Sequence, residues 1–202
     1  DKANRSSIKS DRGIKLDDAL KIFEKIKTNF NLPILYISHS QSEVARLSDK
    51  IVVLEKGSIL EQGKTLEILS SFIVAKKLGL RDLSSFIEAT VCNHAPDGIT
   101  ELDFAGYKLF LPKIDTPLGR KVRLRILAKD ITLAIDKPQK ISALNILKGE
   151  VVEIILGSGP GAVIGIKVGN HKLITRITQR SLNAMDLKLG KTCFAFLKSV
   201  SV

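Results

Sequence analysis

The sequence predicts an α/β region followed by an all-β region of OB-like type. Residues 16–89 combine apolar residues at helical spacing with short apolar runs, which is typical of helices packed on strands. From about residue 90 onward, short strands of alternating apolar and polar residues end at glycine turns. That pattern indicates a small barrel or an OB-like sandwich. The change of pattern places the boundary between the two regions near residues 91–97.

The first region is expected to begin with a helix, a strand and a second helix. Apolar residues recur at helical spacing over 16–30, whereas Pro33 precedes a short apolar run over 34–38 that we interpret as a buried strand. Ser40, with Glu43 three residues later, forms a capping-box pattern and predicts a short helix that ends near residue 48. A single strand of this type cannot form a parallel sheet, so we expect further strands from a preceding segment.

A hairpin and two more helices are expected next. Two apolar runs flank residues 55–58 and predict the hairpin, and helices are expected over 64–70 and 80–89. In the second region, a hairpin is expected around Gly106. Later strands are expected in the runs VRLRI, GEVVEIIL, GAVIGIKV, KLITRIT and TCFAFLK, with the glycine-rich GSGPG read as a turn.

Composition and charge narrow the classes of function. The chain of 202 residues has a net charge of +11, and residues 90–202 hold 17 Lys and Arg against 9 Asp and Glu. A basic half is compatible with nucleic acid, an acidic lipid surface or a small anion, and equally with a solvated lysine-rich surface. Only 5% of residues are aromatic, which makes a base-stacking, nucleic-acid-binding platform an unfavoured alternative. Cys92 and Cys193 are far apart, as expected for a reducing compartment, and the lone Cys92–His94 pair does not predict zinc.

His39 stands at the end of the expected strand, where open α/β sheets bind ligands. Taken alone, its position favours the simpler interpretation, a histidine that only bonds a nearby carbonyl. Its surroundings, however, resemble the switch region of ABC transporter ATPases. The residues that carry this resemblance are Ser38, His39, Glu43, Ser48, Asp49, Lys50, Gly57, Ile59 and Gly63. The resemblance implies that His39 contacts the γ-phosphate of ATP.

Other parts of that family are not found in the sequence. It contains no G-x-x-x-x-G-K-[ST] loop to hold phosphates, no LSGGQ-like signature and no apolar strand ending in Asp-Glu. We therefore expect the C-terminal part of an ABC ATPase domain over residues 1–90, with Asp1 at the position of the family's D-loop. ATP and magnesium are expected in the complete protein, and this chain alone is expected not to hydrolyse ATP.

The second half resembles the Mop/TOBE-like part of the ATP-binding subunits of molybdate importers. The matching residues are Arg125, Ala128, Lys129, Asp130, Ile131, Thr132, Ala134, Pro138, Ser142, Asn145, Leu147, Gly149, Ile177, Thr178, Ser181, Leu187, Leu189, Gly190, Ala195, Lys198 and Ser199. The resemblance implies a β-rich connector over 91–141 and an oxyanion-binding domain over 142–202. It also implies a homodimer that docks on a membrane permease at the cytoplasmic face of the membrane.

Molybdate, a tetrahedral dianion, requires hydroxyl or N–H donors and positive charge. By resemblance, the candidate oxyanion ligands are Ser142, Asn145, Thr178, Ser181, Lys198 and Ser199. Leu144 stands where molybdate-binding relatives often have an arginine, and it offers neither a charge nor a donor. Two alternatives remain open: an ATPase segment for another cargo, such as tungstate or sulfate, whose β domain only dimerises, and an OB-like nucleic-acid-binding module.

Overall fold

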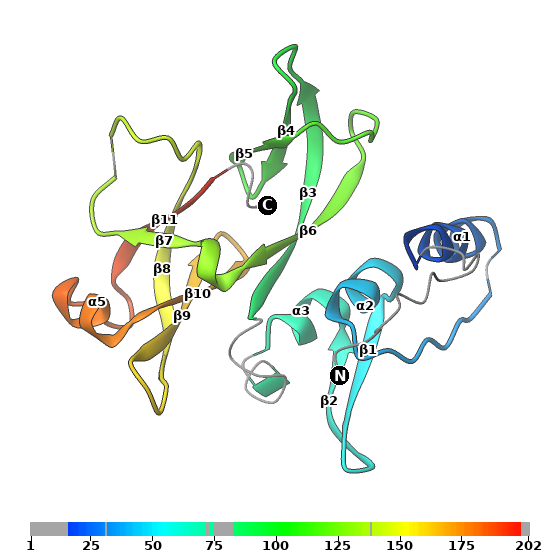
Figure 1. The fold of residues 1–202 in the computed structure, drawn as a ribbon, viewed down its shortest axis with the longest axis horizontal. Coiled ribbons are helices and arrows are strands. Elements are labelled where there is room, and N and C mark those ends of the chain that lie inside the picture. The colour runs from blue at the N-terminus through cyan, green and yellow to red at the C-terminus, as the bar shows by residue number, and fades with distance from the viewer. Residues whose placement is uncertain (1–15, 31, 72, 75–82, 138, 199–202) are drawn as a thin grey trace, which may run out of the picture. The chain divides into compact units, whose positions relative to one another are not determined.

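The chain is mostly β and consists of two compact units, each of which is described by itself (Figure 1). The computed structural model describes residues 16–30, 32–71, 73–74, 83–137 and 139–198. The first unit comprises residues 1–48 and the second comprises residues 49–202. No helix in the described part of the chain combines the length and the apolar composition needed to cross a membrane.

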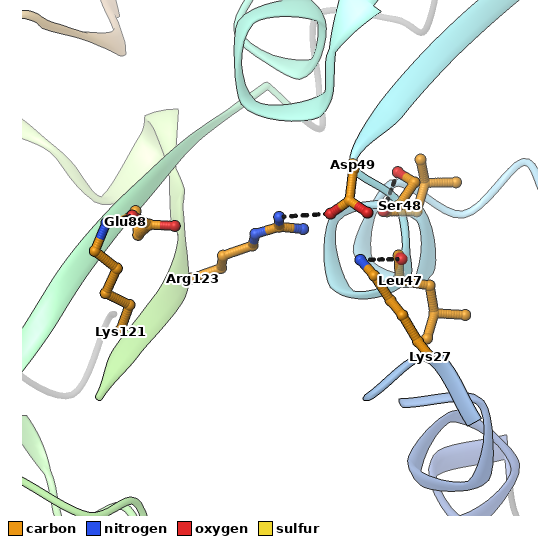
Figure 2. Close-up of polar contacts among 8 residues, drawn as sticks. Lys27, Leu47, Ser48, Asp49, Glu88, Lys121 and Arg123 are labelled. Atoms are coloured by element: carbon orange, nitrogen blue, oxygen red, sulfur yellow. Dashed lines mark hydrogen bonds and ion pairs between the residues drawn. The ribbon is translucent and has the colours of Figure 1, made fainter. Parts of the chain in front are cut away.

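The first unit contains the two expected helices, α1 (Leu16–Asn29) and α2 (Gln41–Leu47). The Arg46 guanidinium donates two hydrogen bonds to the Glu24 carboxylate and so links α2 to α1. At the same C-terminal end of α2, Lys27 Nζ donates to the carbonyl oxygen of Leu47 at 3.0 Å (Figure 2). These contacts hold the last turn of α2 against α1.

The buried strand expected over 34–38 is not formed, and that prediction is wrong for the described structure. Residues 32–38 carry no strand assignment, and the side chains of Leu35 and Ile37 are 91% and 89% exposed. A strand requires a neighbour to satisfy its N–H and C=O groups. None of the described strands pairs with this segment. The apolar run thus has the composition of a buried strand without the partner that would bury it.

The second unit begins with the expected hairpin, β1 (Lys50–Glu55) and β2 (Ser58–Lys64), followed by α3 (Thr65–Leu69). Gly57 has a φ of 80° at the hairpin turn, a conformation that glycine adopts without strain. The Thr65 N–H donates to the carbonyl oxygen of Asp49 at 3.1 Å, so the start of α3 is tied to the start of the hairpin. The hairpin and the helix expected over 64–70 are confirmed.

The helix expected over 80–89 is wrong, because residues 84–94 form strand β3 (Ser84–His94). This strand is central, with β4 on one side and β6 on the other. Its first four residues are all buried, so the start of the strand shows no alternation that would identify it. The strand also runs through residues 90 and 91, where the ATPase segment was expected to end and the connector to begin.

A four-stranded sheet follows, in the order β5-β4-β3-β6. Its other strands are β4 (Ile99–Phe104), β5 (Tyr107–Pro112) and β6 (Lys121–Leu127). The hairpin expected around Gly106 joins β4 to β5. On β6, Arg123 Nη2 lies 3.5 Å from Asp49 Oδ1, and Lys121 pairs with Glu88 of β3 (Figure 2).

A five-stranded sheet has the order β10-β9-β8-β11-β7, and its later strands agree with the expected runs. Its strands are β7 (Thr132–Ala134), β8 (Asn145–Leu156), β9 (Gly161–Val168), β10 (His171–Thr178) and β11 (Thr192–Leu197). A short helix, α5 (Gln179–Ala184), follows β10 and was not expected from the sequence. The Thr178 side chain caps it by accepting from the Ser181 N–H.

The two sheets share one core and one continuous segment. Residues 121–134 supply β6 to the four-stranded sheet and, after a single 3-10 turn (Ala128–Asp130), β7 to the five-stranded sheet. Buried hydroxyls add polar links. Ser85 Oγ of β3 accepts from the Ile174 N–H of β10 at 2.6 Å, and Thr175 Oγ1 of β10 donates at 2.8 Å to the carbonyl oxygen of Ile131, in the segment that joins β6 to β7. Because a buried polar group without a partner is costly, these links fix the register between the sheets.

Gly149 on β8 allows β9 to approach closely, and its substitution gives a test of the packing. A Cβ atom at this position would lie 2.7 Å from the carbonyl oxygen of Lys167, a backbone atom that cannot move independently. We expect Gly149→Ala to lower the free energy of unfolding by about 1–3 kcal/mol, the usual cost of overpacking. Urea titration followed by circular dichroism measures this change.

Gly159 provides the matched control for that substitution. A Cβ atom at Gly159 would have no heavy atom within 4 Å, and its φ is not positive. Gly159→Ala should therefore leave the urea midpoint nearly unchanged. Equal midpoints for the two variants would contradict the close packing of β8 against β9.

Candidate functional site

His39 lies in the short connection between the extended segment 32–38 and α2, and its side chain is exposed. The residues on either side of it are held by hydrogen bonds. Tyr36 Oη donates to Glu43 Oε2 at 2.8 Å, and Ser38 Oγ donates to the same oxygen at 2.7 Å. The Ser40 N–H donates to Ser38 Oγ at 3.0 Å, which closes a turn around His39.

The expected capping box at the start of α2 is only half formed. Ser40 Oγ accepts from the Glu43 N–H at 3.4 Å, as an N-cap residue should. In the full motif the Glu43 carboxylate would accept from the Ser40 N–H. Here the carboxylate instead accepts from Tyr36 and Ser38. The motif therefore identified the start of the helix but not the partners of its glutamate.

Hydrogen bonding shifts two pKa values in this segment in opposite directions. The hydroxyl of Ser38, followed by that of Tyr36, stabilises the Glu43 carboxylate and lowers the pKa of Glu43 from its usual 4.5. The same bond to Glu43 raises the pKa of Tyr36, because an ionised phenol would lose its donor and face a negative charge. Glu43 is therefore a carboxylate, and Tyr36 a neutral donor, at neutral pH.

Asn145, an expected oxyanion ligand, is fully buried and joins the two sheets. Its side-chain oxygen accepts from the Phe110 N–H at 2.6 Å, and its side-chain nitrogen donates to the Phe110 carbonyl oxygen at 3.0 Å. The amide thus imitates a strand neighbour on the edge of β5. Sequence resemblance marked this asparagine, but nothing in the sequence pointed to Phe110, which lies 35 residues earlier.

Ser142 and Lys198 lie at the same end of the five-stranded sheet as Asn145. Ser142 is an exposed residue three positions before the start of β8, and Lys198 is exposed directly after Leu197, which pairs with Asn145. Leu144, directly before Asn145, has a side chain that is 54% exposed. Ser199 and Asp1, the other residues proposed from the resemblances, lie outside the described residues.

Thr178 and Ser181 form a second group at the start of α5. Their hydroxyl oxygens are 2.8 Å apart, and both are at least partly accessible. Nearby, Gln179 Nε2 donates to the carbonyl oxygen of Gly159 at 2.8 Å and so holds the glycine-rich turn between β8 and β9. The reading of that stretch as a turn is confirmed, whereas the role of Gln179 was not foreseen.

The two groups of candidate ligands lie at opposite ends of the sheet (Figure 1). Thr178 of β10 pairs with Gly161 of β9, which lies beside the last residues of β8. Lys198 follows Leu197, which pairs with Asn145, the first residue of β8. The 12 residues of β8 between them extend over roughly 36 Å at about 3.3 Å per step. One copy of the chain therefore does not bring both groups to one small anion.

The residues described by the structure contain no group of three or more His, Cys, Asp or Glu side chains suited to a metal ion. His94 instead contacts Thr100 Oγ1 at 3.0 Å and the carbonyl oxygen of Thr116 at 2.8 Å. Cys92 Sγ donates to the carbonyl oxygen of Thr90. Both members of the Cys92–His94 pair thus take part in local hydrogen bonds.

The lowered pKa of Glu43 predicts a measurable pH dependence. Because its pKa is lower in the folded than in the unfolded chain, its hydrogen bonds stabilise the segment above the unfolded value of about 4.5. That stabilisation is lost as the pH falls through the lower pKa of the folded chain.

We expect the carboxyl carbon of Glu43 to titrate below 4.5 by NMR, and Ser38→Ala to raise the midpoint of this titration. Ser58→Ala, a hydroxyl deletion in the hairpin, should leave the midpoint unchanged; an unshifted midpoint in Ser38→Ala would contradict the assignment.

Comparison with known proteins agrees with the resemblances in both halves of the chain. The TOBE domain model matches residues 141–202. Over 185 residues, or 91% of the chain, the sequence is 34% identical to the molybdenum import ATP-binding protein ModC of Mesorhizobium japonicum and covers 50% of that protein. It is 31% identical to ModC of Escherichia coli over 92% of the chain and 53% of that protein.

A solved structure shows the same fold for the β region. The cytoplasmic molybdate-binding protein ModG, in a form with molybdate bound, superimposes with a TM-score of 0.50 at 23% identity, over 58% of this chain and 92% of its own. The chain spans about half the length of the curated relatives it matches. Residues 141–202 thus match the TOBE domain model, and 91% of the chain is similar to about half of a molybdenum import ATP-binding protein.

Proposed function

We propose that this chain is part of the energy-coupling, ATP-binding subunit of a molybdate importer, with a regulatory β domain that binds an oxyanion. The observation that carries the proposal is the match of 34% identity over 91% of the chain. A continuous alignment that omits only about a tenth of the chain must include both His39 and most of residues 141–202. The switch segment and the TOBE domain therefore occur together in one type of protein.

In the complete protein, His39 would contact the γ-phosphate of ATP, as the resemblance implies. Its exposed side chain at the start of α2 is compatible with that role. The described residues contain neither a phosphate-binding loop nor a set of carboxylates for magnesium. Nucleotide and magnesium binding therefore belong to the complete protein, and we derive no hydrolytic step from this chain.

The oxyanion site is proposed to lie between two copies of the chain. Ser142 and Lys198 lie at one end of the five-stranded sheet, and Thr178 and Ser181 lie at the other. A second copy, packed in the opposite direction, would place the hydroxyls of its α5 beside the lysine of the first. Lys198 would supply charge to a dianion, while the serine and threonine hydroxyls would supply donors. Asn145 would position this end of β8 through Phe110.

The partners follow from the same proposal. The complete subunit would dock on a membrane permease at the cytoplasmic face of the membrane, and its β domain would hold two subunits together. Molybdate is the proposed oxyanion, with tungstate and sulfate as competitors of the same shape. A β domain that dimerises without binding an oxyanion is the second candidate, and the exposed Leu144 favours it because leucine offers no charge to an anion.

A site shared by two copies predicts that ligand and dimer stabilise each other. We expect sodium molybdate to increase the dimer fraction in sedimentation equilibrium, because a ligand that binds only the dimer shifts the equilibrium toward it. Lys198→Ala and Ser181→Ala, which lie at opposite ends of one copy, should each weaken molybdate binding in calorimetry. Lys121→Ala, which removes a charge from the first sheet, is the matched control.

The outcomes of that experiment distinguish a shared oxyanion site from the alternatives. Molybdate binding to a monomer would overturn the shared site. A stable dimer whose molybdate titration shows no heat and no shift would favour the purely dimerising domain. A stronger response to sulfate than to molybdate would identify another cargo.

Restoring an arginine at position 144 should strengthen oxyanion binding. A hydrogen bond from a charged donor contributes about 1.5–3 kcal/mol, so we expect Leu144→Arg to raise the affinity for molybdate about tenfold or more. Leu118→Arg adds the same charge at an exposed leucine in the turn between β5 and β6 and serves as the control. An equal gain in both variants would mean that only the net charge matters, and no gain in either would contradict a site next to Leu144.

A further inference from the structure

The carboxylate of Glu43 connects residues on both sides of His39. Two hydroxyl groups, from Tyr36 and Ser38, converge on its Oε2 atom at 2.8 and 2.7 Å. Glu43 itself lies in the first turn of α2, four residues after His39. We propose that Glu43 is a positioning residue that fixes the direction in which His39 projects. This inference rests on the proposed role of His39 as the residue that contacts the γ-phosphate.

Ser38 transmits the effect of Glu43 to the backbone around His39. Its hydroxyl donates to Glu43 and at the same time accepts from the Ser40 N–H at 3.0 Å. A hydroxyl has one hydrogen, so donation to Glu43 leaves its lone pairs directed toward the amide. Without the carboxylate, the hydroxyl would be free to rotate and to donate elsewhere. Glu43 therefore stabilises the turn whose middle residue is His39.

The frame that carries Glu43 is itself fixed to α1. The ring of Tyr36 makes an edge-on contact with the ring of Phe23, with centroids 6.0 Å apart. Arg46, on the same helix as Glu43, pairs with Glu24. The donor Tyr36 and the helix that carries the acceptor Glu43 are thus both attached to α1, so the carboxylate links parts that are already held in place.

A direct ion pair between Glu43 and His39 explains the geometry less well. The lowered pKa of Glu43 is due first to Ser38 and then to Tyr36, and the charge of His39 makes the smallest contribution. The His39 side chain is exposed, whereas that of Glu43 is partly buried among the hydroxyls. Glu43 thus acts on His39 through the backbone turn, which leaves the imidazole available for a ligand.

NMR of the full 202-residue chain tests this inference without nucleotide. Three-bond couplings between Hα and Hβ of His39 report whether its χ1 angle occupies one rotamer or several. We expect couplings of a single rotamer in the wild-type chain and averaged couplings in Glu43→Ala and in Ser38→Ala. The Ser40 amide should also exchange with solvent about tenfold faster in both variants, as loss of a hydrogen bond that depends on a charged group implies.

Two further variants separate positioning from a general loss of structure. Glu67→Ala makes the same change in the first turn of α3, at an exposed side chain, and should leave His39 unchanged. Glu43→Gln keeps the size of the side chain and one acceptor, and should give couplings between those of the wild type and Glu43→Ala. The amides of Arg46 and Leu47 should keep their wild-type exchange rates, showing that α2 remains folded.

The results would decide the inference independently of the proposed function. Averaged His39 couplings in the wild-type chain, or unchanged couplings in Glu43→Ala, would overturn the positioning role. Loss of protection at Arg46 and Leu47 together with His39 would also overturn it, because Glu43 would then only stabilise the helix. Failure of the molybdate experiments would contradict the proposed function and leave these couplings unaffected.

Discussion

The pairing of one continuous segment with both β-sheets is the constraint on which the second unit depends. Residues 121–134 pair first with β3 and then, after one 3-10 turn, with β11. Neither sheet can lose this segment without losing a strand. The common core and the buried hydroxyls of Ser85 and Thr175 extend the same link. The two sheets are therefore one folding unit.

The connection between the sheets also involves one of the candidate oxyanion ligands. The Asn145 amide bonds Phe110 of the other sheet, so its observed role is to hold the start of β8 in place. The exposed hydroxyls and Lys198 remain as the candidate groups that solvent can reach. Their separation along β8 is a consequence of strand length, and it is the reason that the proposed site requires a second copy of the chain.

In the first unit, a polar network replaces an apolar core around His39, the residue proposed to contact the γ-phosphate. Segment 32–38 has apolar side chains in water, so packing does not fix the position of His39. Hydrogen bonds from Tyr36 and Ser38 to Glu43 do so instead, and the N-cap at Ser40 completes the turn. An exposed histidine on a turn held by a carboxylate can approach a ligand while its backbone stays fixed.

The sequence by itself determined most of the local elements and the resemblance to known proteins. The helical spacing over 16–30, the glycine hairpins and the alternating strands after residue 99 all rest on interactions between near neighbours, which sequence patterns record. The motifs around His39 and Ser142 identified the relatives. Tertiary structure alone decided that residues 84–94 form a strand, because burial of 84–87 on both faces interrupts the alternation that marks one. It also decided that 34–38 pairs with none of the described strands, that Asn145 binds Phe110, and that the candidate ligand groups lie far apart, because each of these depends on contacts between residues distant in the chain.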